Sequence, residues 1–473
     1  MHPRHFSRVR IAVSACLCAL LLLAYNGFAR VGGAGGHSSH SSGSRSSGGH
    51  SYSSHSSGYS SGSASSGGSF GMGGIIALIV IAIIVYVVIQ KMKGGTNNLL
   101  DNGPDNSYRP SKPFPAGLDE EKVREAFLGI QDAWQRKDLK GVRKWLSDGM
   151  YQRLTAQFRM MQVLGQSNRL SNIRIGSITV DEVRADNDYQ TAEVAISFMM
   201  DDSFTSDKYP QFNEEFSGDT ATEYWTFIKR ADAEADKNLY DNNNCPNCGA
   251  PFEQKLGEIS RCSNCGTLTN SAAYDWVLSE ITQEDDYSGG AGLSSDAGLK
   301  TLMTGDDYFA VQRVEDIASN IFMQIMEVLT GRDDEKLARF ADEKTEQAIL
   351  QQKKSLQPFV FDRIYLNYVT LSGYQTANDL VYLRFDLAAT FRRVSIAKGI
   401  QVLDNDFVTR RFGMTLARKA APAKAAAGET VFSYECSNCA APFTDTTKDR
   451  CDYCDALVVD TERNWVLTDF SWS

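Results

Sequence analysis

Apolar residues recur every three or four positions in the stretch that begins near residue 120, and this spacing predicts an α-helix with one buried face. The residues that carry the spacing are Val123, Phe127, Ile130 and Trp134. The same pattern predicts a short second helix over 139–146 and a third helix over 151–161. Ser147 or Asp148 directly precedes the third helix, where either side chain can cap its N-terminus.

The period of the apolar positions changes to two beyond Asn172, which is typical of β-strands with one buried face. The strands predicted in the first half of the folded region are 173–183, 191–200 and 222–230. The second half repeats this order, with a helix over 317–328 and strands over 363–371, 379–391 and 407–418. Helices followed by antiparallel strands predict an α+β fold in which helices cover one face of each sheet.

Two pairs of segments indicate an internal duplication. The segment "RKDLKGVRKW" at 136–145 aligns without gaps on "GRDDEKLARF" at 331–340. Further along, "YDWVLSEI" from Tyr274 resembles "RNWVLTDF" from Arg463. Self-similarity at this scale is the sequence signature of a repeated structural unit.

A helix packed on a curved sheet can form a cone around an apolar pocket. The candidate residues for lining such a pocket are Trp134, Trp145 and Trp225. Large aromatic side chains at these positions serve more often as core residues, so we expect the three tryptophans to lie in the core.

Eight of the ten cysteines form two quartets with the spacing of a metal site. The quartets are Cys245, Cys248, Cys262, Cys265 and Cys436, Cys439, Cys451, Cys454. A Cys-x-x-Cys turn points two thiolates at one place, and a second turn opposite completes a tetrahedron suited to zinc. Four thiolates leave no open coordination position, so we expect two structural zinc ions per chain, each in a small ribbon. Metal binding of order 10 kcal/mol would stabilise such small pieces.

Iron in the same quartets is the alternative, and it would make the protein a one-electron carrier. Gly249 and Gly266 follow the two Cys-x-x-Cys pairs of the first quartet, and such tight turns suit either metal. The second quartet has Ala440 and Asp455 at these positions, so the argument from tight turns is weaker there.

The N-terminal 93 residues contain no Asp or Glu and read as a targeting and anchoring segment. Residues 1–29 have the basic start, apolar middle and small cleavage-site residues of a signal peptide, with an uncleaved membrane helix as the alternative. A Ser/Gly/His-rich tether follows over 30–74, and the uncharged stretch 75–90 predicts a transmembrane helix. Lys91 and Lys93 then place the rest of the chain in the reducing cytoplasm, where cysteines bind metal.

Charge and residue content exclude several classes of function. Beyond residue 93 the chain has 41 basic and 58 acidic residues, so on average it repels nucleic acid. No histidine occurs after residue 55, which removes Ser-His and Cys-His catalysis from the folded region. A hydrolase would need a carboxylate pair, and the candidates are Asp201-Asp202, Asp285-Asp286, Asp306-Asp307 and Asp333-Asp334. Adjacent acids of this kind are usually solvated, so we expect no enzymatic activity.

The stretch 126–175, "AFLGIQDAWQRKDLKGVRKWLSDGMYQRLTAQFRMMQVLGQSNRLSNIRI", resembles bacterial relatives of the C-terminal domain of the mitochondrial inner-membrane import scaffold, translocase subunit forty-four (Tim44-like). The resemblance covers about 115–235, and it reaches 306–420 only through the internal repeat. It implies a cone-shaped fold akin to nuclear transport factor two, contact with a bacterial inner membrane, and docking of other proteins.

The pattern and the resemblance together predict the organisation of the chain. The expected parts are a signal peptide at 1–29, a tether at 30–74, a membrane helix at 75–90, a linker at 91–115, a Tim44-like domain at 116–238, a zinc ribbon at 240–282, a linker at 283–305, a divergent second copy at 306–425 and a second ribbon at 430–473. We expect a non-enzymatic scaffold or adaptor that docks proteins or lipid at the cytoplasmic face of the inner membrane, with a link to protein transport.

Overall fold

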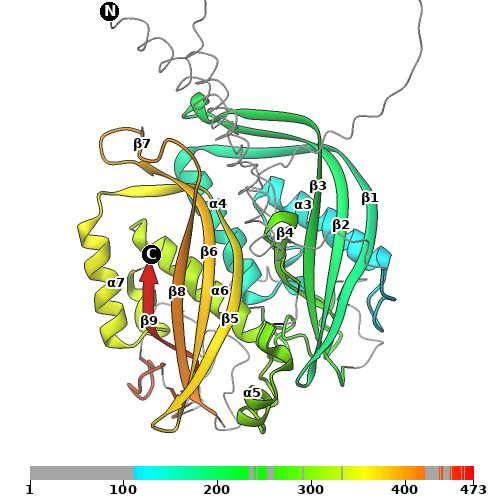
Figure 1. The fold of residues 1–473 in the computed structure, drawn as a ribbon, viewed down its shortest axis with the longest axis vertical. Helices are drawn as coiled ribbons and strands as arrows, with labels where there is room; N and C mark the ends of the chain where they lie inside the picture. Colours follow the sequence, from blue (N-terminus) through cyan, green and yellow to red (C-terminus); the bar gives the residue numbers. More distant parts are fainter. Residues whose placement is uncertain are drawn as a thin grey trace, which may run out of the picture. The chain divides into compact units, whose positions relative to one another are not determined.

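The computed structural model describes residues 111–472 apart from short gaps (Figure 1). The gaps are 234–238, 241–242, 253–259, 290–291, 332–333, 421–435, 437, 440, 442–447, 449, 460 and 463. The predicted signal peptide, tether and membrane helix lie outside the described residues. Among the helices of the described part, none combines the length and the apolar character that crossing a bilayer requires.

Residues 120–283, the first half, form helices followed by a four-stranded antiparallel sheet in the order β1-β2-β3-β4 (Figure 1). The elements are α3 (Glu120–Arg136), η2 (Arg143–Trp145), α4 (Asp148–Leu164), β1 (Gln166–Asp186), β2 (Tyr189–Ser206), η3 (Pro210–Phe212), β3 (Glu214–Arg230) and β4 (Val277–Gln283). As predicted, the side chain of Ser147 caps α4, because its Oγ accepts a hydrogen bond from the Met150 backbone N–H at 3.0 Å.

Residues 311–472, the second half, repeat the plan with a sheet in the order β5-β6-β8-β9, and a short strand β7 pairs with β6. Its elements are α6 (Val311–Leu329), η6 (Asp334–Arg339), α7 (Glu343–Ser355), β5 (Phe359–Ala377), β6 (Leu380–Ser395), β7 (Gln401–Val402), β8 (Val408–Lys419) and β9 (Val466–Trp472). Between the halves lie η4 (Glu284–Asp286), η5 (Gly292–Ser295) and α5 (Ala297–Leu302). The predicted α+β class with two antiparallel sheets is confirmed.

Several elements differ from their predicted extents. The short second helix is the 3₁₀ turn η2, and α7 has no counterpart in the prediction because only Thr345 and Ile349 are buried on it. Strand β1 begins seven residues before the predicted start. Gln166 and Asn168 at the start of β1 are polar and yet buried. The spacing of apolar residues therefore could not predict this part of the strand.

The duplication is visible in equivalent contacts of the two halves. A shift of 195 residues carries Arg136 to Gly331 and also Phe127 to Phe322, and both phenylalanines are fully buried. Leu146 forms a parallel bridge with Leu278, and the equivalent Ala341 forms one with Leu467. Each half is therefore built from the same helix-and-sheet unit.

The strand after each cysteine quartet belongs to the sheet. Strand β4 pairs with β3, and β9 pairs with β8, in both cases antiparallel. This corrects the expected boundaries at 240–282 and 430–473. The segment that carries each cysteine quartet, here called the metal segment (245–265 in the first half and 436–454 in the second), is an insertion before the last strand of a sheet. The physical reason is that the Val-Leu pair of each final strand is buried in the core of its half.

The two halves pack together through α4, within one compact unit. Ala156, Met160 and Leu164 of α4 are part of the apolar core of the second half. At the start of α4, a Cβ on Gly149 would lie only 2.4 Å from the backbone oxygen of Asp316 on α6. Glycine at this position therefore permits the close approach of α4 to α6.

We expect Gly149→Ala to lower the free energy of unfolding by about 1–3 kcal/mol, because the added methyl group must push α4 away from α6. Gly141→Ala is the matched control, since a Cβ there meets nothing within 4 Å. Urea unfolding of the two variants and of the native chain measures the difference. Equal stability of all three would show that α4 and α6 do not pack as closely as described.

Candidate metal centres and the junction between the halves

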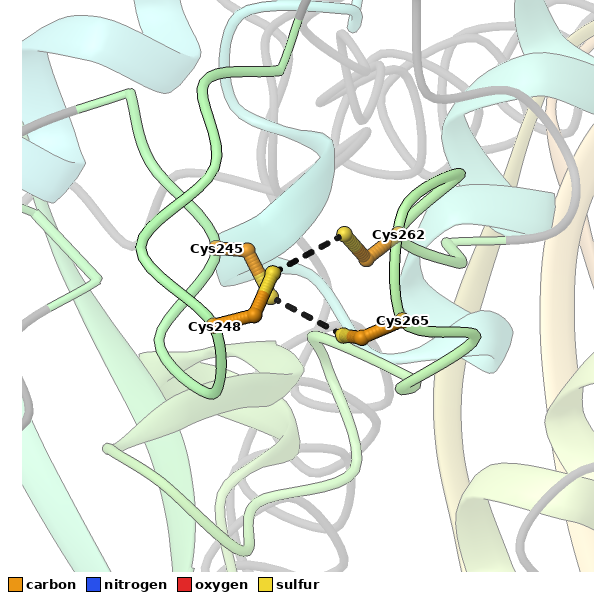
Figure 2. A group of neighbouring side chains, drawn as sticks. All are labelled: Cys245, Cys248, Cys262 and Cys265. Carbon is orange, nitrogen blue, oxygen red and sulfur yellow. Dashed lines mark hydrogen bonds between the residues drawn. The ribbon is translucent and has the colours of Figure 1, made fainter.

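Both Cys-x-x-Cys pairs of the first quartet form the same tight turn. The Cys245 backbone N–H donates to the Ala250 carbonyl at 2.8 Å, and the Gly249 N–H donates to the Cys245 carbonyl at 2.9 Å. Gly249 has a φ of 72°, in the left-handed region that glycine adopts without strain. The pair at Cys262 repeats these bonds. Each turn points two sulfur atoms toward the opposite turn (Figure 2).

The second quartet makes this turn without glycine. The Cys451 N–H donates to the Ala456 carbonyl at 2.9 Å, and the Asp455 N–H donates to the Cys451 carbonyl at 2.9 Å. Asp455 has a φ of 57°. Aspartate tolerates the left-handed region better than most residues, so it serves here in place of glycine.

The structure brings all eight predicted cysteines together as two clusters. Within each cluster the four Sγ atoms lie within 4.8 Å of one another. The sulfur separations are 3.7 Å for Cys245–Cys265, 3.8 Å for Cys248–Cys262, 3.4 Å for Cys436–Cys454 and 3.6 Å for Cys439–Cys451. A tetrahedral ion with metal–sulfur bonds of about 2.3 Å requires separations of about 3.8 Å. The clusters therefore fit a bound metal ion, and their cysteines are not disulfide-bonded.

Hydrogen bonds and burial divide the thiols of the first cluster. Bonds from Thr267, with a further one from Asn247, lower the pKa of Cys265 to about 6. Asn264 donates to Cys248 at 3.4 Å and lowers its pKa in the same way. Burial raises the pKa of Cys245 to about 12. Two sulfurs are thus readily available as thiolates, and a metal ion must displace the proton from Cys245.

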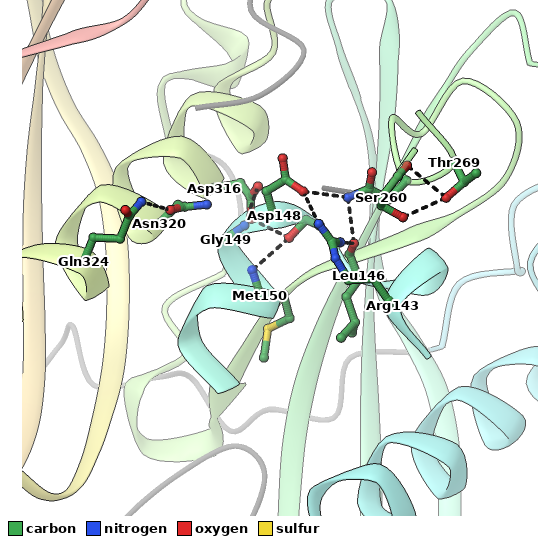
Figure 3. Close-up of polar contacts among 12 residues, drawn as sticks. Arg143, Leu146, Asp148, Gly149, Met150, Ser260, Thr269, Asp316, Asn320 and Gln324 are labelled. Carbon is green, nitrogen blue, oxygen red and sulfur yellow. Dashed lines mark hydrogen bonds and ion pairs between the residues drawn. The ribbon is translucent and has the colours of Figure 1, made fainter. Parts of the chain in front are cut away.

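Polar side chains tie the first metal segment to α4 (Figure 3). Ser260 and Thr269 share a hydrogen bond at 2.8 Å across the segment. The next residue, Asn270, donates to the Leu146 carbonyl at 3.0 Å and to the Asp148 carboxylate at 2.9 Å. Buried Arg143 forms an ion pair with the same carboxylate at 2.5 Å. The metal segment is therefore anchored at the N-terminus of α4.

The same end of α4 contacts the second half through Asp316 on α6. This carboxylate accepts hydrogen bonds from the Ser147 hydroxyl and from the Gly149 backbone N–H, the latter at 3.1 Å. Burial raises the pKa of Asp316 to about 6. Asp148 and Asp316 thus place the first metal segment and the second half on either side of one helix end.

A second junction contact lies further along α4. Glu327 of α6 is buried. Its carboxylate accepts a hydrogen bond from Gln152 at 2.6 Å and forms an ion pair with Arg159 at 2.7 Å. A buried carboxylate is costly unless its oxygen atoms are paired in this way. These contacts make Gln152 and Arg159 of the first half the partners of a charge in the second half.

The N-terminus of α6 is capped by the first half. Its own N-cap residue, Ala310, makes no side-chain hydrogen bond. Asp186, at the end of β1, accepts from the backbone N–H groups of Val311 at 2.9 Å and Gln312 at 3.0 Å. Burial raises the pKa of Asp186, whereas these hydrogen bonds favour its charged form. A carboxylate at this position also complements the positive end of the helix dipole.

The tryptophans lie in the core, as expected. Trp134 and Trp225 are each at most 2% exposed, and Trp145 stacks on Tyr240 with ring centres 4.7 Å apart. A pocket of about 40 Å³ lies at the junction of the halves and is lined mostly by polar residues. Its lining includes Ser147, Asp148, Asn270, Gln312 and Asp316. This volume holds a few water molecules, so the pocket is too small for a lipid.

Sequence reasoning found the cysteine clusters but missed the junction. Gln152, Arg159 and Glu327 have no motif, and each is an ordinary polar residue of a helix. The one available signal is that Glu327 lies within the strongly apolar run of α6, which is buried around most of its circumference.

The family model of the Tim44-like domain matches residues 119–239. The matched range begins one residue before α3 and ends six residues before the first cysteine quartet. A search of curated proteins found no match, and a search of solved structures found none either.

We expect the purified full chain to contain two metal ions, measured by elemental analysis. Cys262→Ser with Cys265→Ser should lower the content to one ion and make the segment around residue 265 sensitive to protease, because half of the ligands are lost. Ser263→Ala, at an exposed non-ligand position of the same turn, is the control and should leave two ions. Two ions in both variants would contradict the assignment of the ligands.

Proposed function

Since residues 119–239 are a Tim44-like domain, we propose that the chain is a membrane-anchored, non-enzymatic scaffold that docks partner proteins at the cytoplasmic face of a bacterial inner membrane. The observation that carries the proposal is the family match, because this domain is associated with binding at membranes. The predicted membrane helix at 75–90 supplies the anchor in this proposal. A connection to protein transport follows from the family alone.

The metal clusters support a structural role. We propose zinc in both, because four thiolates are its usual structural ligand set and leave no position for water or substrate. Each cluster precedes the final strand of a sheet, so the ion fixes the return of the chain to that sheet. Such a role strengthens a binding surface and requires no chemistry.

One carboxylate in each of three of the acidic pairs that a hydrolase would need has a structural partner. Asp202 binds Asn168, Asp286 accepts a hydrogen bond from Asn367 at 2.9 Å, and Asp306 forms a buried ion pair with Arg418. Each of these carboxylates has a structural partner, and this supports the non-enzymatic proposal.

Electron transfer through iron is the second candidate, because four cysteine sulfurs at these separations suit iron as well as zinc. Colour separates the two metals. The purified chain should be colourless with two zinc ions, whereas visible absorption with bound iron would replace the scaffold proposal with an electron carrier.

We expect crosslinking of the full chain in its native membrane, followed by affinity capture and mass spectrometry, to recover specific proteins. A chain truncated after residue 110 is the control, since it keeps the predicted anchor and lacks the described domains. Proteins captured by the full chain and not by the control would support docking. Recovery of lipid alone would replace the protein partner with a lipid ligand, and identical captures would contradict the proposal.

A further inference from the structure

One face of α4 forms a large part of the junction between the halves, and the equivalent face of α7 is open. The α4 stripe consists of Gly149, Gln152, Arg153, Ala156, Arg159 and Met160, and none of these residues is exposed. The shift of 195 residues carries them to the α7 stripe, Lys344, Gln347, Ala348, Gln351, Lys354 and Ser355, and all six are exposed. The equivalence is sound because the inner faces of the two helices also correspond, with Leu154 and Ile349 both buried.

The other side of the junction has an open equivalent as well. The α6 stripe that faces α4 consists of Asp316, Asn320, Met323 and Glu327. Its equivalent on α3, the α3 stripe, consists of Glu121, Glu125, Leu128 and Asp132, and all four residues are exposed. Each chain therefore carries equivalents of both helix stripes of the junction a second time, one on α7 and one on α3, and both are exposed.

The chemistry of the junction recurs on these two outer stripes. At the junction, Gln152 and Arg159 hold the carboxylate of Glu327. The equivalents are Gln347 and Lys354 on α7 and Asp132 on α3. An amide and a cation thus again correspond to a carboxylate, with lysine in place of arginine and aspartate in place of glutamate.

The start of the stripe keeps complementary charge by a different route. Gly149 approaches Asp316 closely at the junction. Its equivalent on α7 is Lys344, and the equivalent of Asp316 on α3 is Glu121. A lysine facing a glutamate replaces the close backbone contact with an ion pair at longer range.

The α3 stripe also exposes an apolar side chain among its acids. Leu128 is 42% exposed, whereas its equivalent Met323 is fully buried at the junction. Leu128 is one of few large apolar residues with such exposure in the described part of the chain. A contact that covered it would resemble the one that covers Met323.

We propose that a second copy of this chain docks its α3 stripe onto the α7 stripe, so that the contact between copies repeats the internal junction. Such a contact is head-to-tail: it joins two different surfaces, and it generates a ring or an open row of copies. The contact is weaker than the internal junction, because Ala156 and Met160 are replaced by Gln351 and Ser355. Its ion pairs are exposed, so association falls as ionic strength rises.

The test is the co-purification of two differently tagged copies of the full chain, solubilised from one membrane in mild detergent at low salt. Lys354→Glu or Asp132→Lys in both copies should lower recovery of the second tag by about five-fold, because each creates a like-charge pair. Both substitutions in one chain restore opposite charges across the contact, and recovery should return. Arg384→Glu, at an exposed position in the middle of strand β6 and on neither stripe, is the control.

Unchanged metal content shows that the variants are folded. Rescue by the double substitution supports the proposal. If each substitution simply damaged its helix, the two losses of recovery would add and would not cancel. Two results overturn it: native copies that do not co-purify, which would leave the outer stripes as solvated ends of the duplicated unit, and equal recovery of all variants, which would place the contact elsewhere.

Discussion

The structure depends on the pairing of a buried charge across the two halves. Glu327 lies in the apolar environment of α6, where an unpaired carboxylate would be costly. Its partners, Gln152 and Arg159, come from α4 of the first half. The carboxylate of Glu327 is therefore paired across the junction by α4, and α4 in turn supplies apolar residues to the second core. A duplicated unit becomes one body through this helix.

The segment that carries the first cysteine cluster contacts the same helix at its N-terminus. Asn270, a few residues after Cys265, binds the start of α4, and Asp316 binds the adjacent residues from α6. The cysteine cluster and the junction therefore share the start of α4 as a common contact. In the proposed scaffold, a metal ion in this cluster would support the docking surface structurally.

Local patterns predicted the parts of the fold that are set by apolar burial and by ligand chemistry. The inner face of α3 follows from Val123 to Trp134, and the thiolate clusters follow from the cysteine spacing alone. Buried polar residues were beyond such reasoning: Gln166 and Asn168 begin β1, and Glu327 holds the junction. The burial of these residues depends on partners distant in the chain. The pairing of the last strands with their sheets likewise depends on distant residues, so the sequence pattern did not predict it.

The central claim is that Arg159 and Glu327 couple the two halves, and a double-mutant cycle tests it most directly. Arg159→Met, Glu327→Gln and the double variant are compared with the native full chain by chemical unfolding. The account predicts a coupling energy of about 1–3 kcal/mol between the two positions. A coupling within error of zero would mean that Arg159 does not hold the charge on Glu327 across the junction, and the central claim would be wrong.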